Sequence, residues 1–176
     1  MSCNNIITAG ISANCENNMG GVLEIYITDR DGVTAITESG GTVSDITLSA
    51  SYSFHQFKFS ENTSSFEENS TINLENGTSY FSQIVSLAIA RRDVDKRNKI
   101  GLLAAGQKKL AVIVKDNNGN YWLIGRTNGA RLTEITGGSG ANRDELNGYN
   151  ITITANEAEQ APLVDSTIIS GIVTES

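Results

Sequence analysis

The chemically versatile side chains of this sequence are few and scattered. His55 is the only histidine, and it lies in a pattern typical of a β-strand with no acidic residue close in sequence. A hydrolytic site needs a nucleophile, a base of suitable pKa and an orienting acid, so we interpret His55 as a structural residue. Glu67 and Glu68 are neighbours in a predicted strand and point to opposite faces, which suits neither a shared proton nor attack on a glycosidic bond. We therefore do not expect an enzyme.

Motifs for binding metals or phosphate are also weak. Cys3 and Cys15 form no CxxC pair, whereas a zinc site needs about four nitrogen or sulfur ligands. The glycine-rich segment 137–142 (GGSGAN) lacks the lysine and the strand-to-helix context of a phosphate loop. Asp116 and the asparagines after it lack the distal glutamate of a calcium loop, so a turn is favoured. The sequence predicts no cofactor, no metal and no small-molecule substrate.

The composition indicates one β-rich domain. The chain has 176 residues, 39% of them hydrophobic and 19% charged, with a single proline. This length suits one domain with its own core. No apolar run approaches the roughly 18 residues that a membrane span needs, and the N-terminus has no signal-peptide pattern. We expect synthesis in a reducing cytoplasm and no membrane partner.

Charge is distributed unevenly along the chain. The net charge is −7, yet Arg30 and Lys58 are the only lysines or arginines before position 91. A nucleic-acid-binding protein would be basic overall, with interleaved aromatic residues that stack on bases. The pattern instead favours docking between proteins, with a solvated helix face as the alternative. The residues expected on such a docking surface are Arg91, Arg92, Lys96 and Lys99.

Alternation of apolar and polar residues predicts most of the secondary structure. Strands are expected at 22–28, 43–48, 52–60, 66–74, 78–90, 110–115, 120–126 and 148–155, and segment 166–173 is expected as a strand or a C-terminal arm. One helix is expected at about 92–105, because its apolar residues recur at helical spacing and acidic residues occupy its first turn. The resulting organisation is an N-terminal arm (1–20), a β-rich core (21–160) and a C-terminal strand or arm (161–176).

Two turn signals specify how strands should pair. Asp31-Gly32 follows the first strand and predicts a hairpin that returns over residues 33–37. Asn118-Gly119 predicts a two-residue turn of primed type between the strands at 110–115 and 120–126. In the longest strand, 78–90, one face carries Phe81, Gln83, Val85, Leu87 and Ile89.

The second half of the chain resembles a class of virion proteins. Segment 110–162 begins with LAVIVKDNNGNYWLIGRTNG, a strand, an Asn-Gly turn and a return, and continues with a glycine-rich loop and a final strand. This order is similar to the C-terminal half of bacteriophage tail-tube-like proteins. Segment 15–26, with its Met-Gly-Gly step, resembles the start of such proteins from phages of Bacteroidetes, including crAss-like phages. The two segments cover somewhat over a third of the chain.

The resemblance implies a tail-tube-like antiparallel β-sandwich or barrel with one helix and extended arms. It implies a virion structural protein whose copies form a ring, six- or twelve-fold, around the channel for DNA ejection. The implied partners are copies of itself, adjacent tail or neck ring proteins, and genomic DNA that passes without tight or specific binding.

An acidic channel wall would keep DNA phosphates from adhering, because few ion pairs would have to break during passage. The lumen-facing candidates are Glu61, Glu67, Glu68 and Glu75. The alternative for these glutamates is an outer loop kept polar for solubility. The alternative for the whole protein is a β-sandwich binding module, such as an adhesin or a carbohydrate-binding domain.

Overall fold

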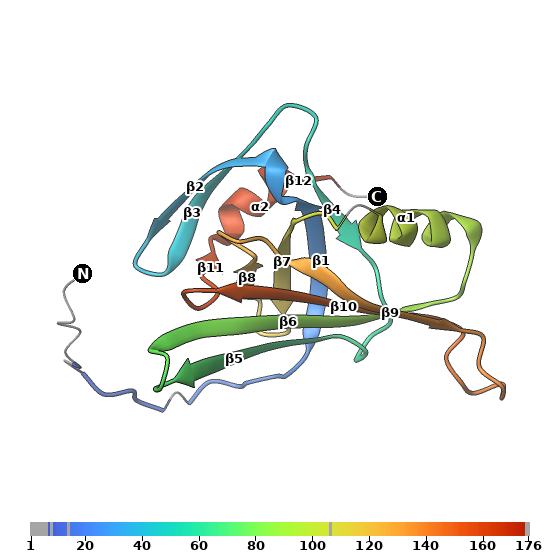
Figure 1. The fold of residues 1–176 in the computed structure, drawn as a ribbon, viewed down its shortest axis with the longest axis horizontal. Helices are drawn as coiled ribbons and strands as arrows, with labels where there is room; N and C mark the ends of the chain where they lie inside the picture. Colours follow the sequence, from blue (N-terminus) through green and yellow to red (C-terminus); the bar gives the residue numbers. More distant parts are fainter. Residues whose placement is uncertain (1–6, 8, 14, 106, 175–176) are drawn as a thin grey trace.

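The computed structural model describes residues 7, 9–13, 15–105 and 107–174, and about half of the chain lies in strands (Figure 1). The expectation of a mainly β protein is confirmed. The described residues also contain two α-helices rather than the single one expected.

The larger sheet has eight strands and curls into a half-barrel. Its order is β12-β4-β1-β7-β8-β11-β3-β2. The strands, in that order, are Val173–Thr174, Phe54–Phe57, Val22–Asp29, Leu110–Asp116, Tyr121–Ile124, Leu163–Val164, Thr42–Leu48 and Val33–Ser39. Two pairs, β11 with β3 and β12 with β4, are parallel. The expected antiparallel pairing therefore holds for the other strand pairs and fails at these two, where short C-terminal strands pair with strands from the first third of the chain.

The smaller sheet is antiparallel throughout, in the order β5-β6-β10-β9. These strands are Ser65–Asn73, Thr78–Ala90, Gly148–Glu157 and Arg131–Gly138. On β6, Gln83, Val85, Leu87 and Ile89 are buried, which confirms the face predicted from the alternation.

The core forms on both faces of β1 and β7. On one face, Ile25, Val112 and Val114 pack in a cluster with residues of β6 and β10 from the smaller sheet. On the other face, Tyr26 and Ile113 pack in a second cluster with residues of β3 and α2. A strand covered on both faces needs apolar residues at successive positions, which explains the run LAVIV at the start of β7.

Helix α1 (Val94–Ala104) matches the expected helix, whereas α2 (Ser166–Ile172) occupies a segment expected as a strand or an arm. The carboxylate of Asp165 caps α2 by accepting from the N–H and hydroxyl of Thr167 at 2.9 and 2.8 Å. Ile169 is buried, and Ile172 packs against the same core cluster three residues later. The expectation of a strand or arm is therefore wrong for 166–172, because a short apolar run fits the period of a strand and that of a helix, whereas Val173 does begin strand β12.

The hairpin expected across Asp31-Gly32 is also wrong. A single 3-10 turn (Arg30–Gly32) follows β1, and β2 pairs only with β3. The guanidinium of Arg30 donates to the carbonyl oxygens of Arg126 and Val33 at 2.8 and 2.9 Å. These bonds direct the chain away from β1, whose two neighbours are β4 and β7.

The β7–β8 hairpin is present, but its turn differs from the expected two-residue form. The N–H of Asp116 donates to Asn120 O at 2.9 Å, which leaves residues 117–119 as the loop. Gly119 has φ 86°, the left-handed conformation that glycine supplies in three-residue hairpin loops.

The two ends of the chain behave differently. Residues 15–21 run beside the β7–β8 turn, where Asn118 bonds to Met19 and Asn18, and Asn117 bonds to Gly20. Residues 7 and 9–13 are exposed. At the other end, β11, α2 and β12 are part of the larger sheet and its covering layer (Figure 1).

Candidate assembly surfaces

The β5–β6 hairpin extends beyond the core. Phe66, near the start of β5, lies against Trp122 with ring centroids 6.4 Å apart. Every residue from 69 to 80 is exposed, and we call this part the distal hairpin. It carries apolar side chains in solvent: Ile72 is 66% exposed and Leu74, beside the tip, is 92% exposed. Apolar residues held in solvent by an ordered hairpin are typical of a contact surface.

The four glutamates proposed for the lumen do not share one environment. Glu61, Glu67 and Glu75 are exposed, in the turn before β5, on the outward face of β5 and at the hairpin tip. Glu68 points inward, and its Oε1 accepts from the N–H of Ala161 at 2.7 Å. Because successive side chains of β5 point to opposite faces, Glu67 and Glu68 lie on different faces of the sheet, as predicted.

A polar network that sequence reasoning missed surrounds Glu68. Gln83 is 1% exposed, and its amide donates to Glu68 Oε1 at 3.3 Å and to Glu159 O at 3.4 Å. Its carbonyl oxygen accepts from the N–H of Gly125 at 3.3 Å. The feature of the sequence that could have predicted this network is the isolated glutamine on the otherwise apolar face of β6. The network connects both sheets to the segment that leaves β10.

Glu157 extends this polar layer. It is 5% exposed, and its Oε1 accepts from the N–H groups of Thr127 and Asn128 at 3.0 and 2.9 Å. Nearby, the guanidinium of Arg126 is paired with Glu38 and with Glu159. Buried carboxylates that accept backbone hydrogen bonds are satisfied structural groups, and we assign this network to the fold rather than to chemistry.

The basic residues proposed for docking are largely engaged within the chain. Lys96 Nζ donates to the carbonyl oxygens of Ala90 and Arg91 at 2.8 and 3.0 Å, and so covers the end of β6. Lys99 pairs with Asp95 at 2.9 Å. The Arg92 guanidinium lies 5.2 Å from the centre of the Tyr149 ring. Arg91 has φ 64° and is exposed.

Helix α1 begins at a charge-assisted cap. Asp93 Oδ1 accepts from the N–H of Lys96 at 2.8 Å, which lowers the pKa of the Asp93 carboxyl from its ordinary value. Ile100 is the one fully buried residue of α1 and partly buried Leu103 packs on the same core cluster, so the helix leaves most of its surface in solvent.

A groove of about 630 Å³ lies between α1 and β4, and we call it the α1–β4 groove. Ile100, Leu102, Leu103, Phe57 and Tyr52 supply apolar surface to it. Leu102 is 70% exposed. Three lysines, Lys58, Lys96 and Lys99, lie along it with two aspartates, Asp29 and Asp95. Exposed His55 also lines the groove.

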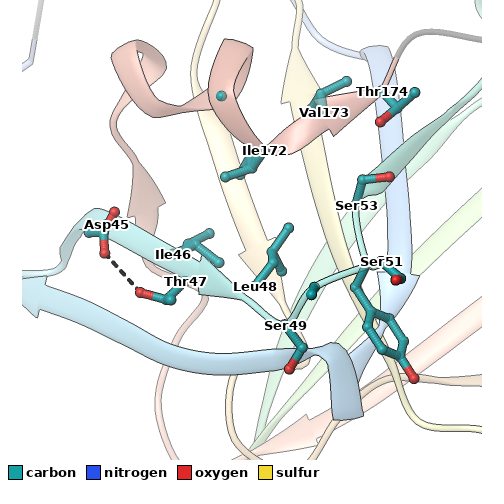
Figure 2. A pocket seen from close by; sticks show the side chains of 13 residues that line it. Asp45, Ile46, Thr47, Leu48, Ser49, Ser51, Ser53, Ile172, Val173 and Thr174 are labelled. Atoms are coloured by element: carbon teal, nitrogen blue, oxygen red, sulfur yellow. Dashed lines mark hydrogen bonds between the residues drawn. The ribbon is translucent and has the colours of Figure 1, made fainter.

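A second hollow, of about 440 Å³, is shown in Figure 2. Ile46 and Leu48 of β3 face Ile172 and Val173 across it, and Asp45 bonds to Thr47 at 3.2 Å. Its lining has one carboxylate, Asp45, and one phenol, Tyr52, and it has no histidine, lysine or arginine.

The outward face of the smaller sheet is polar and almost uncharged at its centre. On β6 and β10, this face pairs Ser82 with Asn156 and Ser86 with Thr152. Thr154 and Thr133 of β9 bond through their hydroxyl groups at 3.1 Å. The sheet thus has one face in the core and a second on which hydroxyl and amide groups surround a half-buried Ile84.

Both edges of this sheet are open. β5 has nine residues and β9 has eight, and each pairs on one side only among the described residues. An unpaired strand presents N–H and C=O groups that can add a strand from another chain.

No group of acidic, histidine and cysteine residues in the described part of the chain is arranged to hold a metal ion. None of the described helices is long and apolar enough to cross a membrane. Cys15 is exposed and free, and Cys3 lies outside the described residues.

Comparison with known proteins found no family model and no curated protein that matches the chain.

Proposed function

We propose that this protein is a virion structural protein that forms a ring or tube segment of a bacteriophage tail around the DNA channel. The observation that carries the proposal is the smaller sheet, with its two long open edges and its polar outward face. If β5 of one copy pairs with β9 of the next, the sheet continues from copy to copy. Such a head-to-tail contact closes into a ring when the rotation per copy allows it.

The polar face supports a role as a conduit. Tight binding to phosphates depends on lysine and arginine, and each such contact would have to break as DNA moves. Serine, threonine and asparagine side chains on β6 and β10 offer no fixed positive charge. Exposed Glu67 adds negative charge at the β5 edge of this face, and Glu134 and Arg131 add one charge of each sign at the β9 edge. In this proposal the wall is neutral to acidic, and the resemblance in the sequence to tail-tube-like proteins points the same way.

The test is electron microscopy of the purified chain and of virions that carry it. The proposal predicts symmetric rings, six- or twelve-fold, with the smaller sheet around the bore. Proline at Ser70 in β5 or at Thr133 in β9 should reduce ring formation, since proline removes a backbone donor from the edge. Proline at Thr34 in edge strand β2 is the matched control. Monomers alone, in virions as well as in solution, would contradict the proposal and favour the binding-module alternative.

A further inference from the structure

Two surfaces that nothing in the described part of the chain covers lie at opposite ends of the molecule. The strands of the smaller sheet run along its longest axis, with the β5–β6 turn at one end and α1 at the other (Figure 1). The distal hairpin is therefore far from the α1–β4 groove of its own chain. Each surface exposes apolar side chains, namely Ile72 and Leu74 on the hairpin and Leu102 beside the groove.

The two surfaces are complementary in charge. No lysine or arginine occurs between positions 58 and 91, so the distal hairpin carries Glu75 at its tip without a basic residue. The groove is lined by three lysines and two aspartates. Both aspartates already have lysine partners, Asp29 with Lys108 and Asp95 with Lys99. Lys58 is exposed and forms no ion pair among the described residues.

We infer that the distal hairpin of one copy docks in the α1–β4 groove of a second copy, end to end. Leu74 and Ile72 enter between α1 and β4, where Ile100, Leu102 and Phe57 receive them. Glu75 at the tip meets Lys58. Burial of these apolar side chains supplies the attraction, and the ion pair fixes the register.

The direction of this contact differs from that of edge pairing. Edge strands meet side by side, whereas the hairpin and the groove meet along the strand direction. A heterologous contact along that axis repeats without closing on itself and builds a column. This inference rests on the proposed function: edges close a ring, and the hairpin joins one ring to the next.

The experiment measures stacking separately from ring formation, by electron microscopy and sedimentation velocity of the full chain. Leu74→Glu and Leu102→Glu should each reduce stacking at least about tenfold and leave rings intact, because a charge at the contact costs more than about 1.4 kcal/mol. Both side chains are exposed, so the fold should tolerate the change, and urea unfolding checks this. Leu146→Glu, at an exposed leucine outside both surfaces, is the matched control and should stack as the parent does.

A charge exchange tests the register. Glu75→Lys and Lys58→Glu should each weaken stacking, and the double variant should restore it. A variant that weakens stacking because it misfolds would not be rescued by the second change. A second readout is oxidation of a Leu74→Cys, Leu102→Cys chain in which Cys3 and Cys15 are serine. It should give a ladder of linked copies, whereas Ser39→Cys with Leu102→Cys should not.

Rings that never stack, or stacks that the leucine and charge variants leave unchanged, would overturn the docking inference while the proposed function stands. Absence of rings altogether would contradict the proposed function instead. If end-to-end ladders form without rings, the docking contact holds and the edge-pairing account is wrong.

Discussion

Gln83 and Glu68 are direct partners across the β5–β6 ladder, and the amide of Gln83 donates to the carboxylate of Glu68 at 3.3 Å. The same oxygen atom of Glu68 accepts from the N–H of Ala161 at 2.7 Å. This pair lies where β5 leaves the core, so it holds the base of the distal hairpin. Gln83 is buried and Glu68 is half-buried, and beside this shared hydrogen bond each side chain also bonds to a backbone group.

Replacement of Gln83 by leucine should destabilise the protein. The change leaves the N–H of Gly125 without its side-chain acceptor and removes a donor from Glu68. Loss of one partner from a buried polar group costs roughly 1–3 kcal/mol. Urea unfolding should show this decrease in the free energy of unfolding. Gln160→Leu, at an exposed position, is the control and should change it by less than about 0.5 kcal/mol. Equal effects of the two changes would contradict the assigned network.

Asp116 should control the β7–β8 turn. Its Oδ1 accepts from the N–H groups of Asn118 and Asn120 at 2.9 and 2.8 Å, and its Oδ2 accepts from Trp122 Nε1 at 3.1 Å. Asp116→Ala should loosen the turn and alter the fluorescence of Trp122, the single tryptophan of the chain. Asp116→Asn, which keeps one acceptor oxygen, should have a smaller effect. An unchanged emission spectrum in the alanine variant would contradict this role.

The cap of α1 should give a pH-dependent contribution to stability. The N–H of Lys96 lowers the pKa of Asp93 in the folded chain, so the folded state favours the carboxylate. Such a contribution is present above the unfolded value of roughly 3.9 and is lost as the pH falls through the lower folded pKa. The stability difference between the parent and Asp93→Ala should therefore be largest near neutral pH and shrink below about pH 4.

Thermal unfolding between pH 7 and pH 3 measures this difference. Asp93→Asn is the matched control, because asparagine caps helices as well as aspartate does but carries no titratable group. A difference between the parent and the alanine variant that is constant over the whole range would contradict the assignment.

Two glycines should respond in opposite ways to alanine. A Cβ at Gly148 would overlap the backbone carbonyl oxygen of Ile89 on β6, so Gly148→Ala should separate β6 from β10 and destabilise the sheet. Gly101 lies in α1 with open space around its Cβ position. Gly101→Ala should stabilise the protein by roughly 0.5–1 kcal/mol. Urea unfolding of both variants checks the signs, and a tolerated Gly148→Ala would mean that β6 and β10 are less closely apposed.

Strands in which apolar and polar residues alternate could be predicted from the sequence, whereas strands that form only by pairing with distant segments could not. β6 has the expected bounds because its apolar face repeats over 13 residues. β11 and β12 have two residues each and exist only through pairing with β8, β3 and β4. The β1–β2 hairpin was predicted wrongly because the turn signal carries no information on the competing partners of β1. The α1–β4 groove was not predictable, since α1 and β4 meet only through the tertiary fold.

The position of β11 between β8 and β3 has a consequence for synthesis on the ribosome. The β2–β3 hairpin joins the rest of the larger sheet through Leu163 and Val164, more than a hundred positions later in the chain. At elongation rates of about 5–20 residues per second this interval is on the order of ten seconds. During that time Val43 and Ile46, which are buried in the complete protein, lack the strand that joins their hairpin to the rest of the sheet. The nascent hairpin is thus a predicted client for a ribosome-associated chaperone, which would shield it until translation delivers its last neighbour.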